Sequence, residues 1–162
     1  MKSEHKHTYS YNEERQEFQI ETRKTTKEDT DFARETHHSA YRDVVIRQFG
    51  TWNENDQDHF FQESWNSEAS QVITCDGTPC GYVYTETQPD RLVLHELVIR
   101  PEFQGRGIGS KILDNIVRKS QEKCIPIYLQ VLHQNQAIEL YKKFGFKKYE
   151  TAENHIPMRR LV

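Results

Sequence analysis

The sequence predicts an α/β fold of three layers, in which helices cover both faces of a mixed, mostly antiparallel sheet of six to seven strands. Three observations predict this fold: the order of helix-like and strand-like patterns, three consecutive strand patterns with short links, and a glycine-rich loop between a strand and a helix. A chain of 162 residues can form one hydrophobic core. We expect a single domain over residues 16–162, preceded by a polar, flexible leader over residues 1–15.

The first half of the chain is expected to contribute one strand and two helices. Apolar and polar residues partly alternate over residues 18–24, which is typical of a strand. Thr26 precedes Asp29 by three positions, the spacing of a capping box, and Gly50 is a natural stop for the helix that follows. A second helix is expected over residues 55–65. Four aromatic side chains in this region are expected to cover the core: Trp52, Phe60, Phe61 and Trp65.

The middle of the chain is expected to form an antiparallel meander. Its segments are rich in β-favouring residues, and residues typical of turns separate them. Links this short join antiparallel neighbours, because parallel strands need a long crossover. The expected strands cover residues 72–75, 80–85 and 92–99, with turns at Asp76-Gly77 and Pro89-Asp90.

The last third is expected to alternate helices and strands. A helix should begin at the glycine-rich loop, because apolar residues recur on one helical face: Ile108, Ile112, Leu113, Ile116 and Val117. A strand over residues 127–132 and a helix between Asn135 and Gly145 should follow. Residues 146–149 and 155–161 are expected to form two closing strands.

The composition argues against several classes of partner. The formal net charge of −3 provides no basic field for nucleic acid. No stretch is long and apolar enough to cross a bilayer, so no membrane partner is expected. The chain has three cysteines and no Cys-x-x-Cys, so we expect small buried thiols, no metal site and a reducing, cytoplasmic location.

The loop Gln104-Gly105-Arg106-Gly107-Ile108-Gly109 is the most informative stretch. Glycine lets backbone N–H groups approach a ligand closely, and a helix N-terminus presents free N–H groups and a positive dipole end. Together they favour an anion, most often a phosphate. The alternative is a tight turn that uses glycine for its geometry alone. A P-loop would need Gly-Lys-Ser/Thr, and the dinucleotide fingerprint would need glycine where Ser110 stands, so neither motif matches.

Two segments carry a resemblance to a known family. Residues 104–109 resemble the Gln/Arg-x-x-Gly-x-Gly/Ala signature of the GNAT superfamily of N-acetyltransferases. Residues 135–146 resemble its second signature, Asn-x-x-Ala-x-x-Leu-Tyr-x-x-x-Gly-Phe. Both occur in the family's order, with a helix and a strand between them. The resemblance implies that residues 16–162 form an acyl-CoA N-acyltransferase domain of the small bacterial type, with a sheet splayed at its centre.

The resemblance also implies where acetyl-CoA binds. The backbone of residues 97–99 would pair with the pantetheine arm like an added strand, and N–H groups of residues 104–110 would surround the pyrophosphate. Asn135 would hydrogen-bond the pantetheine or its neighbourhood. The implied cofactor-binding residues are Leu97, Val98, Ile99, Gln104, Gly105, Arg106, Gly107, Ile108, Gly109, Ser110, Asn135 and Tyr141.

The chemistry requires a base for the amine and an acid for the leaving thiolate. The resemblance implies Tyr141 as the acid, although a tyrosine on the apolar stripe of a helix also suits the core. Many relatives carry a glutamate where this chain has Val93, so Glu96 is the expected base, and His95 or ordered waters are the alternatives. Both side chains also suit a structural role as hydrogen-bonded groups. Strand alternation predicts that His95 and Glu96 point to opposite faces, so only one should reach the site.

The expected function is transfer of an acetyl group from acetyl-CoA to a primary amine, on a small molecule or a protein, by direct attack on the thioester. Val93 keeps open the alternative of a non-catalytic acyl-CoA-binding regulatory module, and another acyl donor is also open. The expected partners are acetyl-CoA and the amine. The oligomeric state is open, and homodimers are common among relatives. His37 and His38 either face an acceptor groove or form a packed or solvated pair, which is the expectation.

Overall fold

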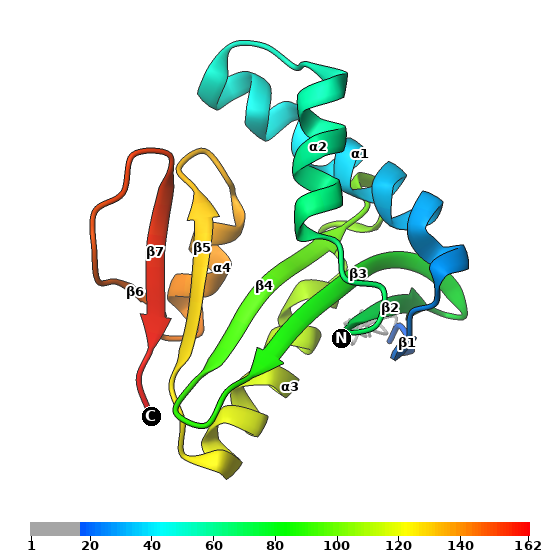
Figure 1. Cartoon of the computed structure of the whole chain (residues 1–162). Coiled ribbons are helices and arrows are strands. Elements are labelled where there is room, and N and C mark those ends of the chain that lie inside the picture. The colour runs from blue at the N-terminus through cyan, green and yellow to red at the C-terminus, as the bar shows by residue number, and fades with distance from the viewer. Residues whose placement is uncertain (1–16) are drawn as a thin grey trace, which may run out of the picture.

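The structure is a computed structural model that describes residues 17–162. It has one seven-stranded sheet with helices on both faces, which confirms the predicted fold class (Figure 1). The strands and α-helices, in chain order, are β1 (Ile20–Lys24), α1 (Thr30–Phe49), α2 (Glu54–Ser64), β2 (Ser70–Cys75), β3 (Thr78–Thr87), β4 (Leu92–Ile99), α3 (Ile108–Lys123), β5 (Ile127–Leu132), α4 (Ala137–Lys143), β6 (Lys147–Lys148) and β7 (His155–Arg160). The expected leader over residues 1–15 lies outside the described residues, and the domain boundary at residue 16 stays a prediction.

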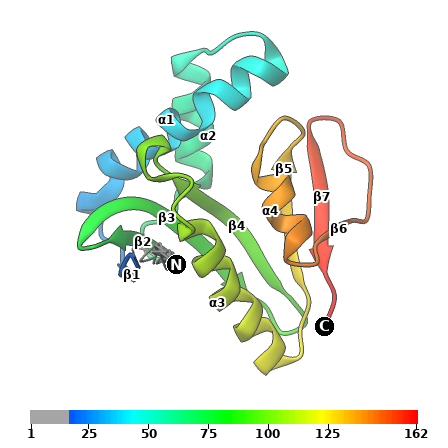
Figure 2. The ribbon, with the colours of Figure 1, turned by 180° about the vertical axis from the view of Figure 1, so that it is seen from behind.

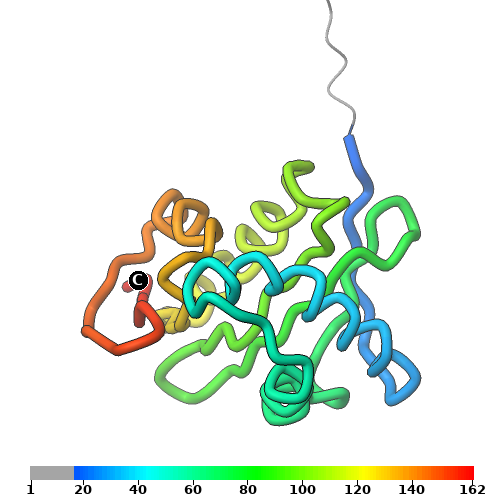
Figure 3. The backbone as a smooth tube through the Cα atoms, turned by 90° about the horizontal axis from the view of Figure 1, so that it is seen from above, coloured from blue at the N-terminus to red at the C-terminus, as the bar shows by residue number. Residues whose placement is uncertain are grey.

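The sheet order is β1-β2-β3-β4-β5-β7-β6. Strands β1 to β4 form the expected antiparallel meander with one more strand at its edge, and β5, β7 and β6 also pair antiparallel. The pair β4–β5 is parallel, so the sheet is mixed. Seen from above, the first and last strands lie at opposite sides of the molecule (Figure 3).

Two hydrophobic clusters separate the three layers. The larger cluster lies between the sheet and α3 with α4, and it contains the predicted apolar face of α3 (Figure 2). Ala33 of α1 and Phe61 of α2 pack on the other face of the sheet, against Tyr82 and Val98. The alternation along β3 and β4 explains this division, because neighbouring residues of a strand point to opposite faces.

Local signals on either side of α1 behave as predicted: a capping box begins the short 3₁₀-helix Lys27–Asp29 that leads into α1, and a glycine ends α1. The Asp29 carboxylate accepts a hydrogen bond from the Thr26 backbone N–H at 2.9 Å, which is one half of a capping box. At the other end Gly50 has a φ of 83°, and its N–H bonds Ile46 at 2.8 Å. A left-handed residue at this place is tolerated best by glycine, so the sequence sets the length of the helix.

Strand β4 contains a β-bulge next to its centre. Tyr84 of β3 pairs with Glu96, whereas the next residue, Thr85, pairs with Leu94, so His95 is the extra residue. A bulge bends its strand and places two neighbouring side chains against one partner. The prediction that His95 and Glu96 point to opposite faces is therefore wrong, and both line the same two pockets.

The parallel pair β4–β5 opens beyond the bulge. Leu92–Leu94 pair with Ile127–Leu129, and the rest of each strand diverges from the other (Figure 1). This confirms the predicted splay at the centre of the sheet. Within residues 17–162, the edge of β4 that faces β5 therefore has no partner strand over residues 96–99, and it borders the opening.

Two side-chain expectations are wrong. Phe60 keeps 54% of its surface exposed, whereas its neighbour Phe61 is buried. Cys124 is exposed at the C-terminal end of α3, whereas Cys75 and Cys80 are buried as predicted. None of the helices within residues 17–162 is long and apolar enough to span a membrane.

Candidate active site

The glycine-rich loop connects the end of β4 to the start of α3. Gly105 and Gly107 have φ values of 77° and 79°, in the left-handed region that favours glycine. A Cβ at either position would meet no atom within 4 Å, so backbone conformation and not space requires these glycines. At Gly109 a Cβ would lie 3.3 Å from Leu140 Cδ2, so this glycine lets α3 approach α4.

The start of α3 presents unpaired N–H groups beside this loop. Lys111 makes the first helical hydrogen bond, to the Gly107 carbonyl at 3.1 Å. The N–H groups of residues 108–110 precede that bond, and the first turn of a helix has no internal acceptor for them. Together with the positive end of the helix dipole, they form a site suited to an anion.

Arg106 and Gln104 flank these N–H groups in different ways. The Arg106 guanidinium is exposed and lies 4.9 Å from the ring centroid of Phe103 and 5.3 Å from that of Phe18. Gln104 donates from Nε2 to the Ile99 carbonyl at 2.9 Å, which fastens the loop to the end of β4. Arg106 Nη2 also donates to the Glu102 carbonyl at 3.3 Å, so both side chains have a bond to the backbone, and the exposed charge of Arg106 remains available to an anion.

A cleft of about 930 Å³ lies in the opening between β4 and β5 and continues between the sheet and α1–α2. Its lining includes the following positions that were considered as site residues: His37, Val93, His95, Glu96, Leu97, Asn135 and Tyr141. The buried Val98, and Ile99 with loop residues 104–110, do not line it. The structure therefore separates the predicted residues into a cleft group and a loop group.

Glu96 is an acidic side chain that lines this cleft. Tyr41 of α1 donates its hydroxyl hydrogen to Glu96 Oε2 at 3.1 Å. Burial raises the pKa of Glu96 to about 7, although the bond from Tyr41 acts in the opposite direction. A carboxyl group with this pKa exchanges a proton readily at neutral pH.

Tyr141 lies on α4 across the cleft. It is 6% exposed and packs edge-to-face on Phe146, with 5.6 Å between ring centroids, so it belongs to the core as well as to the cleft wall. Burial, and then the charge of Glu96, raise the pKa of Tyr141. Its hydroxyl group therefore keeps its proton at neutral pH.

Asn135 makes a local hydrogen bond just before α4 and also borders the cleft. Its Oδ1 accepts a hydrogen bond from the Ala137 backbone N–H at 2.9 Å. The same residue is partly buried and lines the cleft. Its side-chain NH₂ group remains for other partners.

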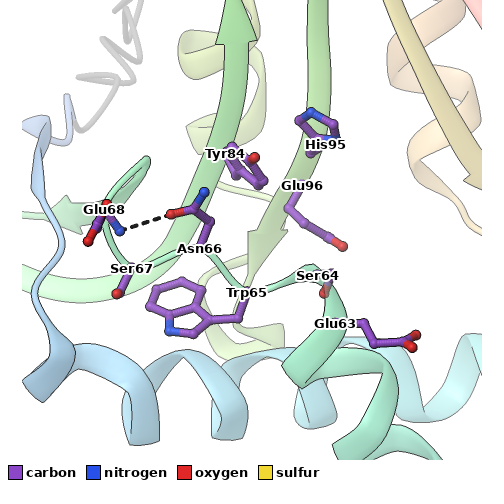
Figure 4. A pocket seen from close by; sticks show the side chains of 9 residues that line it. All are labelled: Glu63, Ser64, Trp65, Asn66, Ser67, Glu68, Tyr84, His95 and Glu96. Carbon is purple, nitrogen blue, oxygen red and sulfur yellow. Dashed lines mark hydrogen bonds between the residues drawn. The ribbon is translucent and has the colours of Figure 1, made fainter.

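A second pocket, of about 520 Å³, adjoins the cleft at Glu96, His95 and Ser64 (Figure 4). His95 stacks on Tyr84 with 4.4 Å between centroids, and its Nε2 lies 3.0 Å from the Glu86 carboxylate. The segment after α2 supplies the opposite wall of this pocket, from Trp65 to Glu68. The residues that line it carry three carboxylates and no lysine or arginine: Glu63, Glu68 and Glu96.

Tyr41 was not predicted from the sequence as a site residue, and His37 was not expected to line the cleft. His37 is buried and lines the cleft, with its ring centroid 4.8 Å from that of Tyr41. The available signal was helical spacing, because Ala33, His37 and Tyr41 recur every four residues on the side of α1 that faces the sheet. That spacing identifies the face but not the carboxylate that Tyr41 meets.

Comparisons with known proteins agree on one family. A model described as acetyltransferase (GNAT) family matches residues 11–146. The chain is 26% identical over 153 residues to an uncharacterized N-acetyltransferase of Methanocaldococcus jannaschii, covering 86% of this chain and 66% of that protein.

Two further relatives are named for different acceptors. A ribosomal protein bS18-alanine N-acetyltransferase of Haemophilus influenzae is 28% identical over 115 residues, which is 70% of this chain and 73% of that protein. A spermine/spermidine N(1)-acetyltransferase of Bacillus subtilis is 38% identical over 60 residues, which is 35% and 40% of the two chains. Among solved structures, PaiA N-acetyltransferase from Thermoplasma acidophilum in complex with coenzyme A superposes with a TM-score of 0.74 at 21% identity, covering 89% of this chain and 99% of that one.

Proposed function

The chain belongs to the acetyltransferase (GNAT) family. From that premise we propose that it transfers an acetyl group from acetyl-CoA to a small cationic amine in the cleft, with Glu96 as the base and Tyr141 as the acid. The matches to this family confirm the family that the two sequence motifs predict, and with it acetyl-CoA as the co-substrate and an amine as the acceptor. The roles of individual residues, the acceptor, a homodimer and a cytoplasmic location stay proposals.

The observation that carries this function is Glu96 in the cleft, hydrogen-bonded by Tyr41, with a pKa of about 7. An alkylamine with a pKa of about 10.4 is neutral in only about 1 of 2,500 molecules at pH 7, a handicap of about 4.6 kcal/mol. The acceptor must lose a proton before its nitrogen can attack. Glu96 is a stronger base than an ordinary carboxylate, because burial disfavours its charged form.

The free edge of β4 supports the proposed position of the cofactor. Residues 97–99 have β3 on one side and, in the described part of the chain, no strand on the other, so their backbone groups are available to an extended pantetheine arm. The arm then leads from the opening of the sheet to the loop at 104–110, where the N–H groups and Arg106 meet the pyrophosphate. A backbone N–H near Val98 stabilises the oxyanion of the intermediate.

Tyr141 completes the transfer. The amine nitrogen forms a bond to the thioester carbonyl carbon, and the carbon–sulfur bond then breaks. Before attack the ammonium group gives one proton to Glu96, which releases it to solvent. The leaving thiolate takes the proton of the Tyr141 hydroxyl, and the second proton of the nitrogen goes to Glu96 and from there, through solvent, back to the Tyr141 oxygen. A hydroxyl group that stays protonated at neutral pH is suited to this step.

The charges around the cleft support a small acceptor with more than one positive charge. Asp56 and Glu96 line the cleft, and Glu63 and Glu68 line the adjoining pocket. Arg91 is the one lysine or arginine among the residues that line either space within the described chain. Opposite charges favour a polyamine, and the Bacillus subtilis relative is named for spermine and spermidine. The Haemophilus influenzae relative, named for a protein amine, supplies the competing acceptor.

Release of free coenzyme A thiol from acetyl-CoA tests this function across a panel of amines. We expect the highest kcat/KM with spermidine or spermine, a lower value with monoamines, and the lowest with an alanine-terminated peptide. A preference for the peptide would overturn the proposed acceptor but would still support acetyl transfer from acetyl-CoA to an amine. Stoichiometric binding of coenzyme A without thiol release for any amine would favour the non-catalytic module that Val93 keeps open.

A further inference from the structure

Two consecutive histidines of α1 lie in different surroundings. His37 is buried against Phe61 and Tyr41 and lines the cleft. His38 lies between α1 and α2, where its ring is 5.3 Å from that of Trp52. Consecutive residues of a helix point about 100° apart, so one histidine reaches the cleft while the other reaches the neighbouring helix.

The two rings continue a chain of hydrogen bonds that begins at α2. Asp58 Oδ1 lies 2.7 Å from His38 Nε2, and His38 Nδ1 lies 3.0 Å from His37 Nδ1. Arg34 holds the start of the chain, because its Nε donates to Asp58 Oδ1 at 2.7 Å and its guanidinium also bonds Glu54 at 3.1 Å. Asp58, His38 and His37 are thus linked side chain to side chain from the surface to the cleft.

The direction of each hydrogen bond follows from the ends of the chain. Bonds from His38 and then Arg34 lower the pKa of Asp58, so its carboxylate is ionised and only accepts. His38 Nε2 must therefore carry the proton, and the Nδ1 of a neutral His38 has a lone pair. His37 Nδ1 then has to donate. Arg34 already supplies positive charge to both carboxylates, so this arrangement needs no charged imidazole and no metal ion.

The remaining ring nitrogen of His37 is the end of this chain. Burial lowers the pKa of His37 to about 4, and a charged His38 lowers it further, so the His37 ring is neutral in either state of His38. Beside a neutral His38, the proton of His37 is on Nδ1 and its Nε2 holds a lone pair. Within residues 17–162 that nitrogen has no hydrogen-bond partner. Tyr41 lies between the two cleft acceptors, with its hydroxyl on Glu96 and its ring against His37.

We propose that His37 Nε2 accepts a hydrogen bond from the acceptor amine, and that Asp58 and His38 are positioning residues that hold His37 in the required tautomer. This inference rests on the proposed function. A neutral primary amine has two N–H bonds and one lone pair. Glu96 and His37 accept the two N–H bonds, so the lone pair is left to face the thioester. His37 gains no proton in this step, because the amine proton goes to Glu96.

The tautomer can be observed without any substrate. A long-range ¹H–¹⁵N correlation spectrum of the full chain, recorded above pH ~7.5 where ordinary imidazoles are neutral, distinguishes the two tautomers. We expect His37 with a protonated Nδ1 and an unprotonated Nε2, and the opposite for His38. A proton on His37 Nε2 would overturn the proposal, because that nitrogen would donate where the amine also donates.

A pair of variants tests the contact with the amine. In His37→Gln the amide oxygen takes the place of Nε2, whereas in His37→Asn the shorter amide takes the place of Nδ1 and leaves no acceptor in the cleft. We expect kcat/KM for the amine to fall about 2- to 10-fold in His37→Asn, the effect of one lost hydrogen bond between neutral groups. His37→Gln should recover most of it, and the affinity for acetyl-CoA should be unchanged in both.

His59 supplies the matched control. It lies on α2 and is exposed beside Glu63, so His59→Asn should keep the wild-type kcat/KM. Equal rates in His37→Asn and the wild-type protein, or equal losses in both His37 variants with unchanged melting temperatures, would overturn the proposal. Absence of amine turnover by the wild-type protein would instead reject the proposed function, and the spectrum would still report the tautomer.

Discussion

The loop half and the helix half of the site are built in different ways. In the loop half, residues 104–110 form the anion site from their own backbone, within one short segment. In the helix half, the contact between Tyr41 and Glu96 joins residues 55 positions apart in the sequence. The first half depends on local conformation, and the second depends on how α1 packs across β4.

This difference explains which functional residues the sequence could reveal. Left-handed glycines at a strand–helix junction have a recognisable pattern, because few other residues tolerate that conformation. A tyrosine on a helix has no such pattern, since its partner is set by the packing of two distant elements. The predictions below test the two halves separately.

Glu96→Gln tests the helix half and should have the largest effect. We expect kcat/KM to fall by about 10²- to 10⁴-fold, the range for loss of a positioned general base. The rise of activity through pH 7 should also disappear, because it reports the ionisation of Glu96 with its pKa of about 7. Thiol release against pH measures both. Unchanged activity would show that ordered water deprotonates the amine instead.

The same variant should change the pH dependence of stability. Folding raises the pKa of Glu96 from 4.5 to about 7, so the folded chain binds the proton more tightly than the unfolded chain between these values. The free energy of unfolding of the wild-type protein therefore falls as pH rises through this range. Glu96→Gln lacks this pH-dependent contribution. The melting temperature of the variant should therefore increase relative to that of the wild-type protein as pH rises from acidic to alkaline values.

Tyr141→Phe tests the proposed acid where the two halves meet. We expect kcat to fall by about 10²-fold or somewhat more, because the thiolate would leave without a positioned proton donor. The affinity for acetyl-CoA should change little, since the ring and its packing on Phe146 remain. Calorimetry with coenzyme A and initial rates with a turned-over amine separate these effects. A rate equal to that of the wild-type protein would leave Tyr141 as a core residue.

Most of the fold followed from local signals. The capping residues of α1, the apolar face of α3 and the turn at Asp76-Gly77 are each encoded within a few residues, and the structure has them where the sequence predicts them. The bulge at His95 was not predictable in this way. Nothing in Leu94-His95-Glu96 differs from a regular strand, and the extra residue is defined only by the pairing with Tyr84.

The bulge explains why the predicted orientation of His95 and Glu96 is wrong. It turns Glu96 toward α1, to the same side as His95, and the Tyr41 hydroxyl group meets it there. Regular alternation would have placed one of the two side chains on the α3 side of the sheet. A one-residue change in register thus accounts for the difference between the predicted and the observed orientation of His95 and Glu96.

Gly107→Ala tests the loop half and should have an intermediate effect. A Cβ in the left-handed region costs about 1–2 kcal/mol, and relief of that strain would move the N–H groups of the loop. We expect the dissociation constant for coenzyme A to rise about 10-fold, as measured by calorimetry. Gly77→Ala is the matched control, because Gly77 has a φ of 81° and equal free space in the β2–β3 turn. Equal coenzyme A affinity in the two variants would contradict an anion site at this loop.

Tyr41→Phe should have the smallest effect, and it tests most directly whether the contact between α1 and β4 tunes the pKa of Glu96. The Tyr41 hydroxyl group lowers the pKa of Glu96 against the effect of burial, so its removal moves that pKa upward. Since Glu96 must be ionised to accept the amine proton, the rise of kcat/KM should move to higher pH. Near neutral pH the loss should be about 2- to 10-fold, the value of one hydrogen bond. A disturbed fold would lower the rate at every pH, whereas loss of this bond alone allows full recovery at alkaline pH. A pH profile that keeps the wild-type midpoint would therefore show that the contact between α1 and β4 supports the fold and does not tune the base.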